Sequence, residues 1–190
     1  MKNSFFLLIL CAICIAASCQ RTENTGDANS SVTVENELNP RSEKEILRRI
    51  DKTEAKLRKA KDIKDEMPAA RELVKMSEAF GQDFPTNKRS ADVIFKAADV
   101  ARGIGEYGKA VQLWGKVWRN YPDYGRAPDA VFMQAFTFEN NLNDLENAKK
   151  YYRKVIENYP EHPLREQSVT ALKNLGKSPE ELIKEFQKGE

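Results

Sequence analysis

Histidine and cysteine, the side chains that most often build metal sites and nucleophilic centres, are scarce in this sequence. The single histidine is His162, which lies in a loop between Pro160 and Pro163, and all three cysteines fall within the first 19 residues. A structural zinc site needs about four such ligands, so the rest of the chain has too few. Gly103-Ile-Gly105 lacks the remaining residues of a phosphate-binding loop and is explained as a helix end. The sequence therefore predicts a protein with no metal, no cofactor and no enzymatic activity.

A large charge of one sign is also missing. The 190 residues carry 31 basic and 29 acidic side chains, which gives a net charge of +2. Proteins that bind nucleic acid, or lie broadly on anionic membranes, carry a clear excess of positive charge. The composition therefore predicts neither a nucleic-acid partner nor broad binding to a membrane surface.

The N-terminus has the pattern of an export signal. Lys2 precedes an unbroken apolar run from Phe5 to Ala17. A helix of this length would span about 20 Å, which is short of the roughly 30 Å hydrocarbon core of a bilayer. The run therefore fits a secretory signal peptide better than a membrane span.

The signal ends in Ala16-Ala17-Ser18-Cys19, which resembles the lipobox of bacterial lipoproteins, with Ala16 where leucine is usual. The resemblance implies cleavage after Ser18 and attachment of acyl chains, palmitate among them, to Cys19. An ordinary signal peptide cut nearby is the alternative. Cys11 and Cys14 would leave with residues 1–18, so the exported chain would keep one cysteine and avoid wrong disulfides.

Residues 20–41 are predicted to be a disordered linker between the lipidated Cys19 and a folded domain. They are polar, rich in Asn, Ser and Thr, and have no helical apolar stripe, so burial cannot offset their ordering entropy. A coil of this length spans about 25 Å root-mean-square. Gln20-Arg21-Thr22 places no aspartate next to the cysteine, and by resemblance to known sorting rules this implies the outer membrane, with the domain facing the periplasm.

From Ser42 onward the apolar residues follow helical spacing, and we expect an all-α fold. Residues 42–85 should form a diverged helical hairpin, whose first helix could alternatively enter a short coiled coil. Residues 86–190 should hold repeats and a C-terminal capping helix. Capping boxes begin at Ser42 and Ser178, Gly81 should end the second helix, and Asn143 should cap the sixth. The expected helices are 42–63, 67–80, 88–102, 106–120, 126–140, 144–158, 164–175 and one beginning at 178.

Two stretches, 107–122 and 145–160, are near-copies with an offset of 38 residues. Each contains a small residue, then an aromatic residue, then a valine, and each ends in Tyr-Pro. Small residues let two helices approach to about 8 Å, and the aromatic ring fills the gap that opens one turn later. The matched residues are Ala110 and Ala148, Trp114 and Tyr152, Val117 and Val155, and Pro122 and Pro160. Trp114, Trp118 and Tyr121 are all expected in the core.

These matched positions resemble the tetratricopeptide repeat, which has small, aromatic and small residues followed by proline. The resemblance covers 86–175 well and 42–85 weakly, and the 37–38-residue period exceeds the usual 34. The longer repeat is similar to those of YbgF-like and BamD-like envelope proteins. The resemblance implies an α-α superhelix of about three hairpins plus a capping helix. It also implies a scaffold that binds another envelope protein or a peptide during outer-membrane assembly or maintenance.

In that family the first helix of each hairpin lines the binding groove. The groove positions of the first full repeat are Asp92, Phe95, Asp99 and Arg102. Those of the next repeat are Asp129, Phe132, Phe136 and Glu139. Phe132 and Phe136 share one helix face and could form a partner hot spot; burial between repeats is the alternative. A second functional class, a peptidoglycan- or glycan-associated accessory beside an outer-membrane transporter, would use Trp118 and Tyr124 as stacking surfaces.

Overall fold

The computed structural model describes residues 42–189, apart from the side chain of Phe186. The described residues all belong to one compact unit. The predicted signal peptide, Cys19 and the linker lie outside the described residues.

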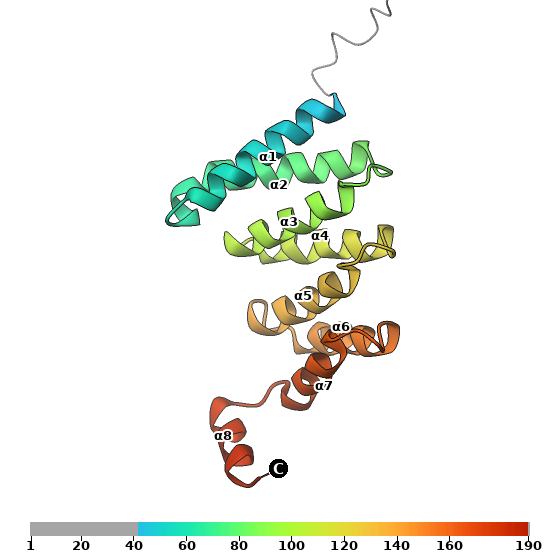
Figure 1. Cartoon of the computed structure of the whole chain (residues 1–190). Coiled ribbons are helices and arrows are strands. Elements are labelled where there is room, and N and C mark those ends of the chain that lie inside the picture. The colour runs from blue at the N-terminus through green and yellow to red at the C-terminus, as the bar shows by residue number, and fades with distance from the viewer. Residues whose placement is uncertain (1–41, 190) are drawn as a thin grey trace, which may run out of the picture. The chain divides into compact units, whose positions relative to one another are not determined.

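The described residues form an all-α domain (Figure 1), which confirms the predicted fold class. Between residues 42 and 189 there is no strand, and none of the helices is both long and apolar enough to cross a membrane. The elements are α1 (Glu43–Lys59), the 3-10 helix η1 (Ile63–Glu66), α2 (Met67–Asp83), α3 (Ser90–Gly103), α4 (Tyr107–Asn120), α5 (Ala127–Asn140), α6 (Leu145–Asn158), α7 (Leu164–Asn174) and α8 (Pro179–Gln187).

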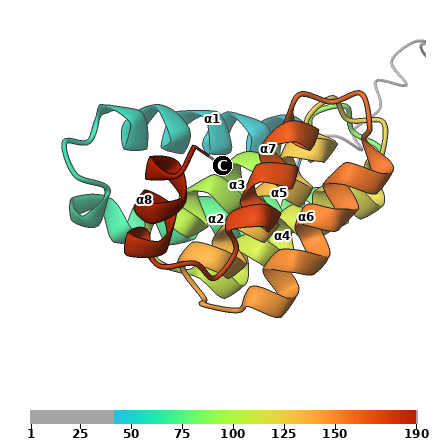
Figure 2. The same ribbon diagram turned by 90° about the horizontal axis from the view of Figure 1, so that it is seen from below.

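Consecutive helices pack as hairpins, α1 with α2, α3 with α4 and α5 with α6, and each hairpin stacks on the next. Helix α7 packs against α6 and also reaches α5, so it covers the end of the stack. The helices form two layers (Figure 2). In this view α1, α3, α5 and α7 lie on one side and α2, α4 and α6 on the other. We call the side formed by α1, α3, α5 and α7 the first-helix face.

The matched residues of the two near-copies form the core of the stack, as the sequence predicted. Trp114 is 0% exposed and Tyr152 is 1% exposed, and the alanines and valines matched to them are also fully buried. Trp114 packs among small residues of α3, including Ala98 and Ala101. A large ring therefore fits only because the neighbouring helix presents methyl groups to it.

Trp118 and Tyr121 lie less deep than expected. Both are half-buried and pack at the edge of the core that contains Trp114. The indole N–H of Trp118 donates to Gln134 Oε1 at 2.6 Å, and the Tyr121 hydroxyl approaches the Gly81 carbonyl at 3.5 Å. Both partners are buried, so each ring lies at the rim while its polar atom reaches inward to a hydrogen-bond acceptor.

Gly81 does not end α2, because the helix continues to Asp83 and Gly81 is buried within it. A Cβ at this position would collide with Ile94 Cδ1 and lie 2.8 Å from Ile94 Cγ1. The glycine therefore permits close approach of α2 and α3 and is no helix stop. By contrast, Gly105 and Gly176 follow α3 and α7 with φ of +81° and +78°, the left-handed conformation of a helix exit.

The start of α6 also differs from the prediction. Asp144, not Asn143, is the N-cap residue, and its carboxylate accepts from the Asn147 amide at 3.0 Å. Asn143 instead adopts φ of +51°, a turn conformation that asparagine tolerates better than most residues.

The two capping boxes behave differently from one another. At α8 the contacts are reciprocal: Glu181 N donates to Ser178 Oγ at 3.2 Å and Ser178 N donates to Glu181 Oε2 at 2.8 Å. At α1 the Ser42 hydroxyl accepts from Glu45 N, while the Glu45 carboxylate binds Arg48.

An ion cluster clamps α2 to α4. Glu78 of α2 accepts from Lys116 Nζ at 2.7 Å and also binds Lys109 Nζ. Partial burial raises the pKa of Glu78, but the hydrogen bonds from Lys109 and Lys116 outweigh it and hold the pKa below its ordinary 4.5. The clamp lies on the opposite side of the stack from α3 and supports the hairpin interface.

We expect Gly81→Ala to destabilise the domain by about 1–3 kcal/mol, because the added methyl group overpacks Ile94. Gly108→Ala is the matched control, since a Cβ there meets nothing within 4 Å in helix α4. This control should be neutral or stabilising by up to about 1 kcal/mol. Urea denaturation followed by circular dichroism checks both; equal stability of the two variants would contradict close packing at Gly81.

The Glu78 clamp should make stability depend on pH. Because the folded-state pKa is lowered, the contribution is present above about pH 4.5 and is lost as the pH falls toward the folded-state value. Glu78→Gln should cost roughly 0.5–1 kcal/mol at pH 7 and flatten the stability profile below about pH 5. Glu72→Gln, which removes one exposed pair with Arg49, should leave that profile unchanged. An unchanged profile in Glu78→Gln would refute the clamp.

Candidate functional site on the first-helix face

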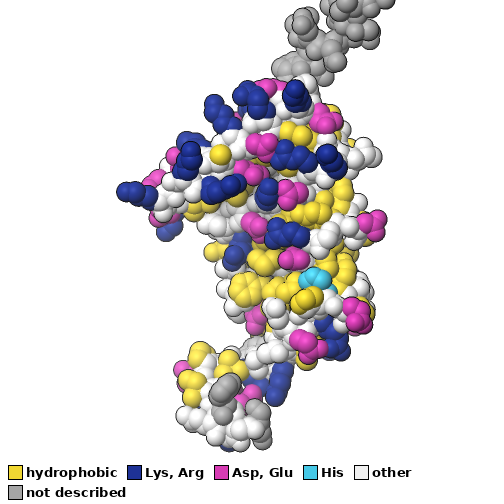
Figure 3. All heavy atoms as spheres, in the orientation of Figure 1, with side chains coloured by type: hydrophobic (Ala, Val, Ile, Leu, Met, Phe, Trp, Pro, Cys, Tyr) yellow, Lys and Arg dark blue, Asp and Glu magenta, His cyan; other side chains and the backbone are white. Residues whose placement is uncertain are grey.

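Three open hollows lie along the first-helix face. One of about 330 Å³ lies between α1, η1, α2 and α3, one of about 180 Å³ lies between α3, α5 and the start of α7, and one of about 540 Å³ lies between α5, α6 and α7. We call the last the aromatic hollow. Figure 3 shows apolar side chains exposed on this face between basic and acidic ones. Such a mixed surface suits an extended protein segment better than a small apolar ligand.

Charged side chains of α3 bridge neighbouring elements on this face. Asp92 accepts from Lys96 Nζ at 2.8 Å and from the Tyr124 hydroxyl at 3.1 Å. Burial and the nearby Asp92 carboxylate raise the pKa of Tyr124 to about 12, so its hydroxyl stays protonated and donates. Asp99 is exposed and lines both the first and the second hollow.

Phe95 and Arg102 lie deeper than groove residues should. Phe95 is 1% exposed, and its ring packs edge-on against Trp114 with centroids 6.5 Å apart. The Arg126 guanidinium carbon lies 3.7 Å from the Phe95 ring centroid and covers it. Arg102 is half-buried, and its Nε has no hydrogen-bond partner among the described residues. These two residues therefore support the face from beneath.

The predicted groove residues of α5 are brought together. Phe132, Phe136 and Glu139 are all half-buried and all line the aromatic hollow. Asp129 belongs to the neighbouring hollow, where its carboxylate lies 3.9 Å from Arg126 Nε. The two phenylalanines are therefore neither fully buried nor isolated on the surface. They form part of a hollow that is open to solvent.

Tyr152 links the framework to the hollow. Its ring packs edge-on against Phe132 with centroids 5.6 Å apart, and its hydroxyl donates to Glu139 Oε2 at 2.7 Å. Burial and the Glu139 carboxylate both raise the pKa of Tyr152, so the hydroxyl remains a donor. Glu139 is thereby fixed at the rim of the hollow.

The sequence did not reveal the contribution of α7, which closes the far side of the aromatic hollow. Its lining residues are Glu166, Gln167, Thr170 and Ala171. The repeat period could have indicated this contribution. The 38-residue repeat offset matches the groove positions Asp129 and Phe132 with Gln167 and Thr170 of α7. Helix α7 thus serves as the first helix of an incomplete unit.

The described residues show a structural role for the single histidine. His162 Nδ1 accepts from Leu164 N at 3.3 Å, so the imidazole binds the backbone amide at the start of α7. Among residues 42–189, no three His, Cys, Asp or Glu side chains group as metal ligands would.

The tetratricopeptide-repeat family model matches residues 92–124 and 129–162, about a third of the chain. The domain is tetratricopeptide-repeat-like. Both matches begin within a first helix, at Asp92 and at Asp129, and run through the following second helix. A search of curated proteins found no match. Tetratricopeptide-repeat domains generally bind other proteins or peptides, which makes a protein-interaction scaffold the function class of this chain.

Proposed function

We propose that this tetratricopeptide-repeat-like protein is a non-enzymatic scaffold that holds a segment of a partner protein on its first-helix face. The aromatic hollow carries the proposal, because it presents two half-buried phenylalanine rings of helix α5 to solvent. Partly exposed aromatic side chains surrounded by polar ones are typical hot spots of protein interfaces.

The chemistry of the hollow favours a partner segment with an apolar side chain next to a basic one. The rings of Phe132 and Phe136 offer apolar surface, while Glu139 and Glu166 contribute carboxylates to the same lining. An Arg or Lys side chain can lie along an aromatic ring and pair with a carboxylate at its end. Burial of the partner's apolar side chain would therefore supply affinity, and pairing with the carboxylates would select for its basic side chain.

We further propose that the scaffold acts in the cell envelope, anchored to the outer membrane through acyl chains on Cys19 and facing the periplasm. The support is the signal-like run that ends at Cys19, the polar linker of residues 20–41, and the resemblance of the repeats to YbgF-like and BamD-like proteins. Because each buried methylene adds about 0.8 kcal/mol, several acyl chains would hold the protein on the membrane permanently.

The geometry does not favour the glycan-associated alternative. Two cations lie over the ring of Trp118, Arg119 Cζ at 5.1 Å and Lys154 Nζ at 4.9 Å from its centroid. Tyr124 packs against Phe95 and donates its hydroxyl to Asp92. Both rings are already occupied by protein groups and offer little open surface for a sugar to stack on.

The hollow can be tested by cross-linking in intact cells, with the partner identified by mass spectrometry. We expect Phe132→Ala combined with Phe136→Ala to abolish capture while the domain stays folded. Because the rings are half-buried, the loss of stability per ring should be roughly half the 3–5 kcal/mol that truncating a fully buried phenylalanine costs. Leu142→Ala with Leu145→Ala, which truncates two exposed leucines outside the hollow, should leave capture intact. If circular dichroism shows that the double phenylalanine variant unfolds, the rings belong to the core. A folded variant that still captures the partner would also refute the proposed site.

The anchor can be tested separately by replacing Cys19 with serine and fractionating membranes. We expect the parent protein in the outer-membrane fraction and Cys19→Ser in the soluble periplasmic fraction, because the variant has no sulfur to acylate. Cys14→Ser is the matched control and should fractionate like the parent. A Cys19→Ser protein that remains in the membrane fraction would contradict lipid anchoring.

A further inference from the structure

Two acidic side chains of helix α1, Asp51 and Glu54, face α3, where they pair with Arg89 at 2.5 Å and with Lys96 at 3.5 Å. Five exposed cations line a shared hollow on the side of the helix away from those pairs. They are Arg48, Arg49, Lys52, Lys56 and Lys59. A chain that is nearly neutral as a whole therefore presents a local basic surface, which we call the α1 basic face.

Part of this positive charge is not neutralised by neighbouring acids. Arg48 pairs with Glu45, Arg49 with Glu72 and Lys56 with Glu66. Lys52 and Lys59 have no acidic partner within 4.0 Å among the described residues. Two unneutralised cations on one helix side are available to an external anion.

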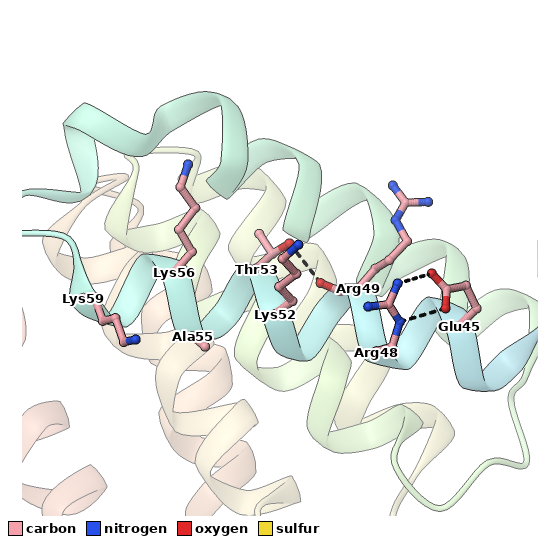
Figure 4. Close-up of a pocket in the computed structure, with 8 residues that line it drawn as sticks. All are labelled: Glu45, Arg48, Arg49, Lys52, Thr53, Ala55, Lys56 and Lys59. Atoms are coloured by element: carbon pink, nitrogen blue, oxygen red, sulfur yellow. Dashed lines mark hydrogen bonds and ion pairs between the residues drawn. The ribbon is translucent and has the colours of Figure 1, made fainter.

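The α1 basic face is open. Figure 4 shows its side chains extending from one helix over a shallow hollow of about 680 Å³, which is lined by residues of α1 alone. Helix α1 is the first element of the stack and packs mainly against α2. Its outer side is therefore free to lie against an extended surface, whereas the sides of α3 and α5 are covered by neighbouring hairpins.

The position of α1 in the chain indicates which anionic surface lies within reach. Helix α1 begins at Glu43, directly after the predicted linker that follows Cys19. If Cys19 holds the chain on a membrane, the linker keeps α1 within about 25 Å of the lipid headgroups. Binding of the face to those headgroups is then intramolecular, so even weak attraction is multiplied by a high effective concentration.

We propose that the α1 basic face binds anionic phospholipid headgroups of the membrane in which the chain is anchored. The inference rests on the proposed anchoring for its geometry, but the attraction itself depends only on the residues of α1. Contact would orient the stack with α1 toward the membrane and the aromatic hollow, at the opposite end, toward the periplasmic partner. An acidic protein or a nucleic acid is the competing occupant, and the test separates these from lipid.

The test uses residues 19–190 with Cys19→Ser, so that no lipid anchor contributes to binding. The three core clusters consist of residues within the described domain, which should therefore fold without the signal. We expect co-sedimentation with vesicles of phosphatidylethanolamine and phosphatidylglycerol, but not with vesicles of phosphatidylcholine. Binding should fall when added salt shortens the Debye length from about 10 Å to about 3 Å.

Lys52→Gln and Lys59→Gln together should weaken binding about 25-fold, since each cation near an anionic leaflet contributes about fivefold. The matched control, Arg153→Gln and Lys173→Gln, removes the same charge from exposed positions elsewhere and should bind like the parent. Circular dichroism verifies the folding of both. Equal losses in the two double variants would overturn the proposal. Parent protein that prefers polyglutamate or duplex DNA to anionic vesicles at equal salt would also overturn it. Because the assay omits the anchor and the partner, it can fail while the proposed scaffold function stands.

Discussion

The close approach of helices at small residues is the constraint on which the rest of this structure depends. Trp114 and Tyr152 are both fully buried, each opposite alanines of the preceding first helix. A larger residue at Ala98 or Ala135 would force the helices apart and open the space that each ring fills. Gly81 is the extreme case, because even a methyl group would collide with Ile94. Stacking at these points sets the spacing of the hairpins and so positions every side chain on the first-helix face.

Because of this constraint, the two layers of helices have different roles. The second helices carry the repeated aromatic and valine residues, which would be needed whatever the protein binds. The first helices carry the residues that differ between units, such as Arg102 in α3 and Glu139 at the matching place in α5. Only Glu139 accepts a hydrogen bond from the aromatic residue of its hairpin, Tyr152. The hollow at the C-terminal end of the stack is thus acidic and aromatic, while the outer side of α1 is basic.

The sequence was informative where one residue type has one physical use. Repeated alanine, aromatic and valine positions predicted the helices, the hairpins and the buried residues between 86 and 175. It was less informative where a residue has several uses. Gly81 could end a helix or allow close packing, and Asn143 could cap a helix or adopt a turn. Which use applies depends on contacts with distant residues, Ile94 in the first case.

The candidate site shows the same limit. Helical spacing placed Phe132, Phe136 and Glu139 on one face, and the structure brings them together. Spacing could not show that Phe95 is covered by Arg126, or that α7 closes the hollow, because both depend on how hairpins stack. Nor could overall charge reveal the α1 basic face, since balanced totals conceal local segregation.

The central claim is that a partner lies on the first-helix face, and site-specific photo-cross-linking in intact cells tests it most directly. A photoreactive residue would be placed at Phe136 in the aromatic hollow, or at the exposed Gln112 on α4 as the matched position on the opposite side. The account predicts a discrete cross-linked species from position 136 and none from position 112. Cross-linking from position 112 alone would contradict it.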